Sequence, residues 1–163
     1  MPSFQRPYKW SVKNIHDLFA DIDANLGKPA YRLGSIVFHS KIEKNDDGDG
    51  TAEWLDIVDG QQRTLTLILA VRAIIKTGSG KPQRDDLKRT LATLNKAIEA
   101  FINRQRFASQ ISERNLLRVH RELVRRVERP SFTEALIDFL LNRCQVVTFV
   151  LKDVSEAFQF FDS

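Results

Sequence analysis

Apolar residues recur along the chain at two different spacings, and these spacings indicate where helices and strands form. From residue 12 to residue 26 they recur every three or four positions, which predicts an amphipathic helix that ends at Gly27. Residues 33–38 and 54–58 are short apolar runs separated by a polar loop, so we expect two strands that pair as a hairpin. Residues 61–76 are apolar on nearly every side, which predicts a helix buried on most of its faces.

The second half of the chain continues with helical spacing and then returns to a strand. Three more helices are expected, over residues 85–103, 112–130 and 134–142. Residues 145–151 are rich in β-branched side chains and predict a third strand. Ser155 begins a last helix with room for only two turns and no capping residue at its end, so we expect the chain to be a fragment of a longer polypeptide.

Length and composition limit the class of protein. With 163 residues, of which 42% are apolar, the chain can form one domain with a proper core, or a compact unit with a helical appendage. The single Cys144 excludes a disulfide framework, and no signal-like apolar run follows Met1, which together indicate a reducing, cytoplasmic setting. The longest apolar run, Leu65 to Ile75, contains polar residues and is too short to span a bilayer. We therefore expect a soluble protein with no membrane partner.

The net charge of +4 is unevenly distributed, because residues 1–71 carry −2, residues 72–129 carry +9 and residues 130–163 carry −3. Part of the basic excess lies on one face of the third expected helix, where arginines are spaced three or four residues apart: Arg114, Arg118, Arg121, Arg125 and Arg129. Such a stripe is either a solvated face or a surface for a phosphate backbone or an acidic partner, since like charges at this spacing repel one another.

The junction between the second expected strand and the next helix is the strongest candidate for a binding site. The strand enters the helix through the turn Asp59-Gly60, and Gln61, Gln62 and Arg63 follow. Such a turn directs free backbone N–H groups and the positive end of the helix dipole to one point, where an anion such as phosphate is favoured. The same residues also fit a plain helix cap, with Asp59 as N-cap and Gln62 reaching back to it. A cap leaves Arg63 unexplained, because an arginine beside the positive end of a helix needs an anion opposite it.

An extended, aromatic segment before the first helix carries a second Gln-Arg pair. Pro7 keeps Arg6 away from helical backbone angles, and aromatic residues stand at positions 4, 8 and 10. These rings could simply anchor the segment on the core, with Arg6 stacked on one of them. The segment could instead bring Gln5 and Arg6 to the turn at residue 60. Both interpretations fit the spacing.

Three motifs, taken together, resemble those of a known family. They are Pro-x-Phe-Gln-Arg-Pro-Tyr-x-Trp at residues 2–10, Leu-Gly-Ser-Ile-Val at residues 33–37 and Ile-Val-Asp-Gly-Gln-Gln-Arg-Thr-Leu-Thr at residues 57–66. In this order they resemble the DGQQR-motif domain that forms the N-terminal half of GmrSD-type, modification-dependent restriction enzymes. The strand at 145–151 also fits, whereas the helical region matches only in general character.

The resemblance implies an α+β fold with a ParB/sulfiredoxin-like core, in which a small mixed sheet is combined with an inserted helical bundle. Residues 1–78 would form the nucleotide-binding core, residues 79–143 a basic helical region, and residues 144–163 a strand and helix that return to the core before the chain is cut off. The activity implied is the binding and hydrolysis of a nucleoside triphosphate, coupled to restriction of foreign, modified phage DNA.

The resemblance also implies roles for individual residues. Nucleotide binding falls to Gln5, Arg6, Gly60 and Gln62, and catalysis to Asp59, Gln61 and Arg63. We expect Asp59 to hold Mg²⁺ or orient water, Gln61 to position the attacking water, and Arg63 to hold phosphates. DNA would bind to Arg114, Arg118, Arg121 and Arg125.

The nuclease of this family resides in a separate C-terminal HNH-type domain, and the chain has no HNH signature. The expected partners are therefore nucleotide, DNA and a downstream nuclease domain or subunit. The alternative function is a non-catalytic module that binds nucleotide or DNA and controls a nuclease outside this chain.

Overall fold

Helices and strands follow one another in the computed structural model nearly as the apolar spacing predicts. The structure describes residues 7–45, 47–78, 80–104, 110–153, 155–156 and 159. Its elements are α1 (Val12–Asn25), β1 (Tyr31–Lys44), β2 (Thr51–Asp59), α2 (Gln61–Thr77), α3 (Asp85–Arg104), α4 (Gln110–Glu128), α5 (Glu134–Asn142) and β3 (Cys144–Leu151). Most of the helix predicted from Ser155 lies outside the described residues.

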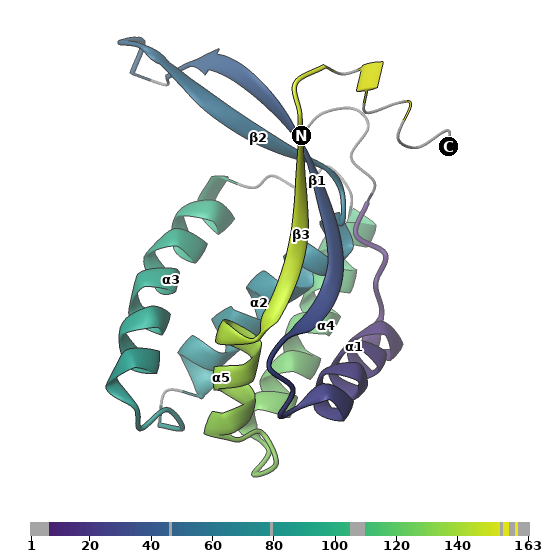
Figure 1. The fold of residues 1–163 in the computed structure, drawn as a ribbon, viewed down its shortest axis with the longest axis vertical. Coiled ribbons are helices and arrows are strands. Elements are labelled where there is room, and N and C mark those ends of the chain that lie inside the picture. The colour runs from purple at the N-terminus through teal and green to yellow at the C-terminus, as the bar shows by residue number, and fades with distance from the viewer. Residues whose placement is uncertain are drawn as a thin grey trace.

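The three strands form one mixed sheet with the order β2-β1-β3. β1 is antiparallel to β2, which confirms the predicted hairpin, and parallel to β3. β1 is longer than the predicted strand at residues 33–38, because its polar second half pairs with β2 alone instead of covering a core. This part of the hairpin extends beyond the helices (Figure 1).

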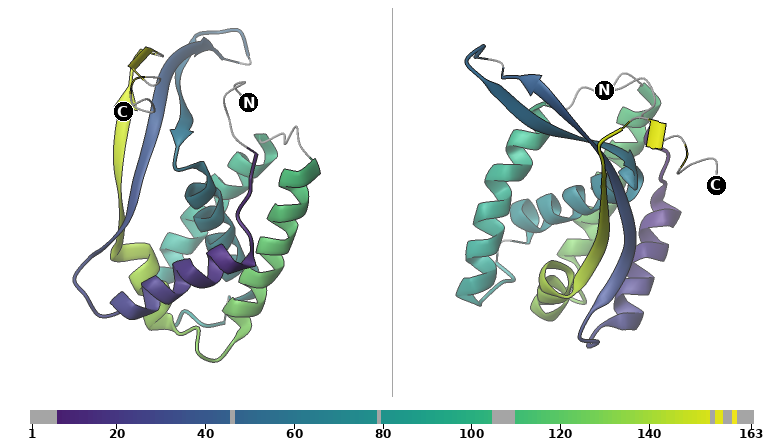
Figure 2. Two further views of the ribbon diagram at one scale, coloured as in Figure 1. Left: turned by 90° about the vertical axis from the view of Figure 1, so that its right-hand side faces the viewer. Right: turned by 45° about the horizontal axis from the view of Figure 1, so that its top comes forward.

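The helices gather on one side of the sheet, and Figure 2 shows this two-layer arrangement from the side. The fold is therefore α+β with a small mixed sheet, as predicted, and α3, α4 and α5 are inserted between α2 and β3. One apolar core joins the helices, with buried members that include Ile15, Phe19 and Ile22 of α1, Ala70 and Ile74 of α2, Val119 and Leu123 of α4, and Ile137 of α5.

Local capping sets the ends of two helices. The backbone N–H of Ser11, the N-cap of α1, donates to Asn14 Oδ1 at 2.9 Å. Thr133 is the N-cap of α5, and its hydroxyl accepts from the Leu136 N–H at 3.3 Å. Residues with strong cap chemistry thus end their helices where the sequence predicts.

Candidate functional site

The turn between β2 and α2 depends on Gly60. This residue has φ of +85°, in the left-handed region, and a Cβ atom there would lie 2.8 Å from the Ser35 carbonyl oxygen of β1. Just before the turn, the pairing register shifts between Val37 and Phe38, which indicates a bulge in the hairpin. The glycine and the bulge together bring the first turn of α2 against β1.

The helix-cap interpretation of this turn is wrong. The N-cap of α2 is Gly60, no side chain caps the helix, and Asp59 is the last residue of β2. Gln62 does not reach back to Asp59 but contacts the N-terminal segment instead. The reason is geometric, because the left-handed glycine turns the chain after Asp59 and leaves its carboxylate at the exposed end of the strand.

A pocket of about 300 Å³ opens at this turn. Its lining comes from three elements and the N-terminal segment: Trp10, Ser35, Val58, Asp59, Gly60, Gln61, Gln62 and Arg63. The structure thus brings together five of the seven residues predicted for the nucleotide site. The other two, Gln5 and Arg6, lie outside the described residues, immediately before Pro7.

The polar side chains of the pocket fall into two groups. Within the part of the chain that the structure describes, Asp59, Gln61 and Arg63 form no hydrogen bond or ion pair with other side chains, so they are available to a ligand. Asp59 is exposed, whereas Gln61 and Arg63 are half-buried. Gln62 differs, because both ends of its amide are bonded to the N-terminal segment.

Arg63 lies directly against the backbone of β1 at Gly34. A Cβ atom on Gly34 would be 2.5 Å from Arg63 Nη1 and 2.9 Å from its Cζ, so only glycine leaves room for the guanidinium there. Gly34 has φ of +129° and lies where the pairing of β1 with β3 shifts register. The structure therefore explains the Leu-Gly-Ser-Ile-Val motif, since its glycine accommodates the arginine of the turn.

Sequence reasoning missed two residues of this site. Trp10 was grouped with the anchoring aromatics, yet it is half-buried and lines the pocket, whereas Tyr8 is the anchor and is only 1% exposed. Gly34 was treated as part of a strand and nothing more. Both belong to motifs that the resemblance singles out, and this was the signal that could have found them.

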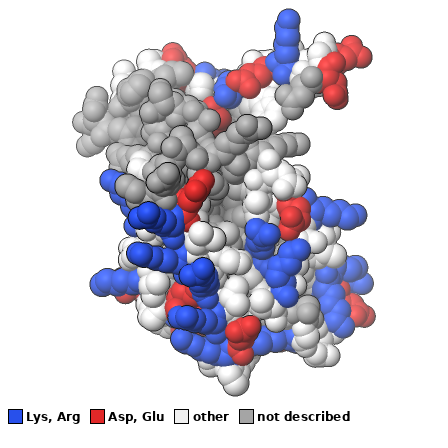
Figure 3. Space-filling view, turned by 180° about the vertical axis from the view of Figure 1, so that it is seen from behind, with Lys and Arg blue, Asp and Glu red and all other residues white. Residues whose placement is uncertain are grey.

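The arginines predicted to contact DNA are all exposed on α4: Arg114, Arg118, Arg121 and Arg125. None of these four forms an ion pair within the described ranges, from residue 7 to residue 159 with their gaps. The opposite face of α4 is buried through Val119, Leu123 and Val127. Figure 3 shows bands of Lys and Arg side chains over the back of the molecule, where helices form the surface.

Other charged residues of α4 and the following turn are engaged inside the protein. The buried Glu122 carboxylate accepts from His16 Nε2 at 3.0 Å and lies 3.8 Å from Arg129 Nη2. The Arg126 guanidinium lies 4.9 Å from the centre of the Phe19 ring, and burial lowers its pKa. Arg129 is thus partly neutralised, which separates it from the four arginines named above.

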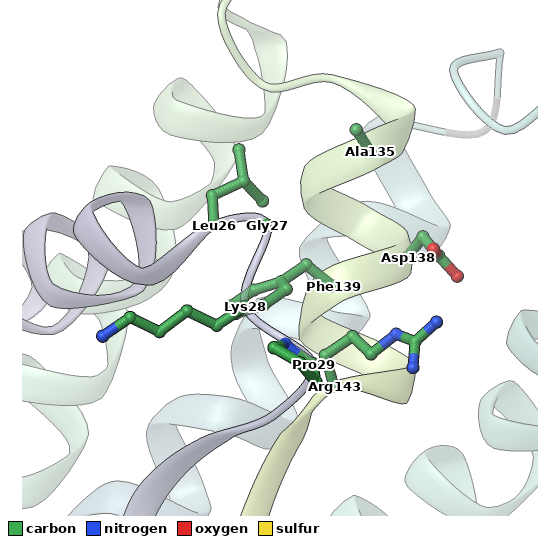
Figure 4. Close-up of a pocket in the computed structure, with 8 residues that line it drawn as sticks. All are labelled: Leu26, Gly27, Lys28, Pro29, Ala135, Asp138, Phe139 and Arg143. Atoms are coloured by element: carbon green, nitrogen blue, oxygen red, sulfur yellow. The ribbon is translucent and has the colours of Figure 1, made fainter.

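A larger pocket of about 510 Å³ lies between the end of α1 and α5. Figure 4 shows its two cationic side chains, Lys28 and Arg143, pointing to opposite sides. Lys28 Nζ donates to Asn25 Oδ1 at 2.6 Å, and Asp138 forms an ion pair with Arg84 at 3.2 Å. Because its polar groups do not converge on one point, this pocket lacks the features of a ligand site.

Three further observations limit the chemistry. Among the described residues, no group of three or more His, Cys, Asp and Glu side chains is arranged to hold a metal ion. Burial raises the pKa of the Cys144 thiol to about 11, so this cysteine stays protonated at neutral pH and is a poor nucleophile. No helix in the described part of the chain combines the length and the apolarity that a membrane span requires.

The comparisons with known proteins come down to one match. The sequence model of a family described as "GmrSD restriction endonuclease, N-terminal domain" matches residues 1–163. A comparison with curated proteins gives no match to this chain.

Proposed function

The chain belongs to the GmrSD restriction endonuclease N-terminal domain family, and we propose on this basis that it binds a nucleoside triphosphate at the turn between β2 and α2 and hydrolyses it. The family itself links the chain to DNA restriction, a defence function, and implies a nuclease domain as its partner. Hydrolysis would control that nuclease. We also infer that the sheet corresponds to a ParB/sulfiredoxin-like core.

One observation carries the proposal: the pocket at the start of α2 collects polar side chains that have no partner elsewhere in the described residues. Asp59, Gln61 and Arg63 line it, beside the first backbone N–H groups of the helix. The first internal helix bond is donated by the Thr64 N–H to the Gly60 carbonyl, so the N–H groups before Thr64 have no carbonyl within α2. A helix N-terminus with an adjacent guanidinium is a favourable site for phosphate.

These groups suit phosphoryl transfer to water. Arg63 and the N-terminal amides of α2 would stabilise the negative charge on the phosphate oxygens as the bond to the leaving diphosphate breaks. Gln61 would orient the attacking water toward the terminal phosphorus, and Asp59 would orient that water or accept its proton. The products are a nucleoside diphosphate and inorganic phosphate.

Asp59 also fits the Mg²⁺ that such reactions use. Magnesium sites commonly use one or two protein carboxylates together with the substrate phosphates, and Asp59 offers an exposed carboxylate at the pocket. The ion would supply neutralisation of the phosphate charge. Gln5 and Arg6 stay predicted contributors from the N-terminal segment.

Phosphate release from the four common nucleoside triphosphates, with Mg²⁺ present, tests the proposal. We expect Gln61→Ala and Arg63→Ala each to lower turnover by roughly 100-fold, the usual cost of removing a group that stabilises or positions the transition state. Gln145→Ala on β3 and Arg89→Ala on α3 are matched controls, because both side chains are exposed away from the pocket.

Two results would contradict the catalytic role. Unchanged turnover in both pocket variants would show that hydrolysis occurs elsewhere. A wild-type protein that binds nucleotide but never releases phosphate would favour the alternative, a non-catalytic module that signals to a nuclease.

We further propose that the exposed arginines of α4 bind the DNA backbone. The observation behind this is their lack of ion pairs among the described residues, since each phosphate contact would release counterions and relieve the repulsion along the stripe. Reversing Arg118 and Arg125 to Glu should weaken DNA binding and reduce its salt slope by about 2, at roughly 0.9 per phosphate. Arg89→Glu with Lys96→Glu on α3 changes the net charge equally and serves as control. An equal effect of both pairs would contradict a specific surface on α4.

A further inference from the structure

We propose that Trp10 forms a base-stacking wall of the pocket and that Gln62 is a positioning residue that holds Trp10 there. This inference rests on the proposed nucleotide binding. It assigns the two glutamines of the turn to different tasks, because Gln61 faces the pocket with a free amide whereas Gln62 organises the N-terminal segment around it.

The contacts of Gln62 are the first step of the argument. Its Oε1 accepts from the backbone N–H of Lys9 at 2.7 Å and from that of Trp10 at 3.1 Å. Its Nε2 donates to the Pro7 carbonyl at 3.0 Å. One side chain on the first turn of α2 therefore makes three hydrogen bonds to four consecutive residues of the N-terminal segment, and it acts there in the way that a paired strand would.

Tyr8 fixes the same segment from the other side. Its backbone N–H donates to Ser112 Oγ at 2.9 Å, and its carbonyl accepts from Asn115 Nδ2 at 2.9 Å. Its hydroxyl lies 2.7 Å from Thr66 Oγ1, in a position that is 1% exposed. The Thr66 hydroxyl donates its only proton to the Gln62 carbonyl at 2.8 Å, so the Tyr8 hydroxyl is the donor to Thr66.

These bonds limit where Trp10 can lie. The segment is held at residue 8 by α2 and α4, and at residues 7, 9 and 10 by Gln62. Trp10 follows directly, half-buried against the core on one side and lining the pocket on the other. The ring thus has little freedom before a ligand binds, and a pre-positioned ring loses little entropy on binding.

A tryptophan at this place determines the class of ligand. The start of α2 and Arg63 suit phosphates, and an indole wall in the same pocket suits a flat, apolar base. Stacking tolerates any base, because every base has a π face, whereas selection needs hydrogen bonds to the base edge. The site should therefore prefer nucleotides over inorganic polyphosphate while discriminating weakly among bases.

Fluorescence of Trp10 is the direct readout, since Trp54 on β2 is the only other tryptophan and can be replaced by Phe. In the Trp54→Phe protein we expect ATP, GTP, CTP and UTP to quench the emission and inorganic tripolyphosphate to leave it unchanged. Trp10→Leu should weaken nucleotide binding by about 5- to 100-fold without changing tripolyphosphate binding, and Trp10→Phe should restore most of the loss.

Gln62→Met tests the positioning role, because it keeps the size of the side chain and removes its three hydrogen bonds. We expect a red-shifted Trp10 emission before any ligand is added, and nucleotide binding weakened several-fold. Asn115→Ala, which touches the segment but not the pocket, should act in the same direction, and Asn142→Ala on α5 should not. Thermal melts of every variant separate these effects from unfolding.

The outcomes are distinguishable. If wild-type protein binds nucleotide and Trp10→Leu binds it equally well, or loses tripolyphosphate to the same extent, the stacking role is overturned while the proposed function stands. If neither nucleotides nor tripolyphosphate bind the wild type, the proposed function fails and the stacking role with it. An unshifted emission in Gln62→Met overturns the positioning role.

Discussion

Replacing Gly34 by Ala perturbs the candidate site without touching any of its polar groups. The new Cβ would lie 2.5 Å from Arg63 Nη1 and 2.9 Å from its Cζ. Since favourable contacts between heavy atoms are about 3.5 Å or longer, the guanidinium must move by about 1 Å. A misplacement of about 1 Å can lower turnover on the order of 100-fold. We therefore expect Gly34→Ala to impair nucleotide hydrolysis nearly as strongly as Arg63→Ala.

The same substitution also has a backbone cost, and this must be separated from the displacement of Arg63. Gly34 has φ of +129°, a conformation that costs an L-residue roughly 1–3 kcal/mol. Urea unfolding measures this loss in free energy, and phosphate release measures turnover on the same preparations. Gly27→Ala is the matched control, because Gly27 has φ of +93° and nothing lies within 4 Å of its Cβ position. This control should lose stability but keep its turnover.

A double-mutant cycle decides whether Gly34 acts through Arg63. In an Arg63→Ala background, Gly34→Ala should cause no further loss of turnover, because the side chain that it displaces is already absent. The backbone strain should persist in that background, so the loss of stability should remain. The reasoning is refuted if Gly34→Ala alone hydrolyses nucleotide at the wild-type rate, or if the second substitution lowers turnover again by the full factor.

Two further predictions concern buried titrating groups. Burial raises the pKa of Tyr8 to about 12, opposed by its hydrogen bond to Thr66, so the folded protein keeps the proton that the unfolded chain loses near pH 10; stability present below pH 10 should fall by up to roughly 3 kcal/mol as the pH rises toward 12. Urea unfolding at several alkaline pH values checks this, and the excess slope should vanish in Tyr8→Phe and persist in Tyr31→Phe. Burial also raises the pKa of Cys144 to about 11, so at pH 8 its thiol should react with a disulfide reagent about 100-fold more slowly than in urea-unfolded protein, and equally fast labelling would contradict its burial.

Most of the secondary structure could be predicted because it depends on local properties of the chain. Helix α1 was predicted over residues 12–26 and spans Val12–Asn25, and α5 was predicted and found over the same residues, 134–142. Spacing of apolar side chains and cap residues act within one or two turns, so a single segment contains the information. The length of β1 was underestimated because its polar half depends on pairing with β2, which lies elsewhere in the sequence.

The sequence alone located the turn at residues 59–63 as the candidate site, because a glycine between a strand and a helix places free N–H groups at one point whatever the rest of the fold does. Only the tertiary structure decided how the residues of that turn divide their tasks. Gln62 is bonded to a segment more than fifty residues away, and Arg63 lies against a glycine of another strand. Such contacts depend on how distant segments pack, and no local pattern encodes them.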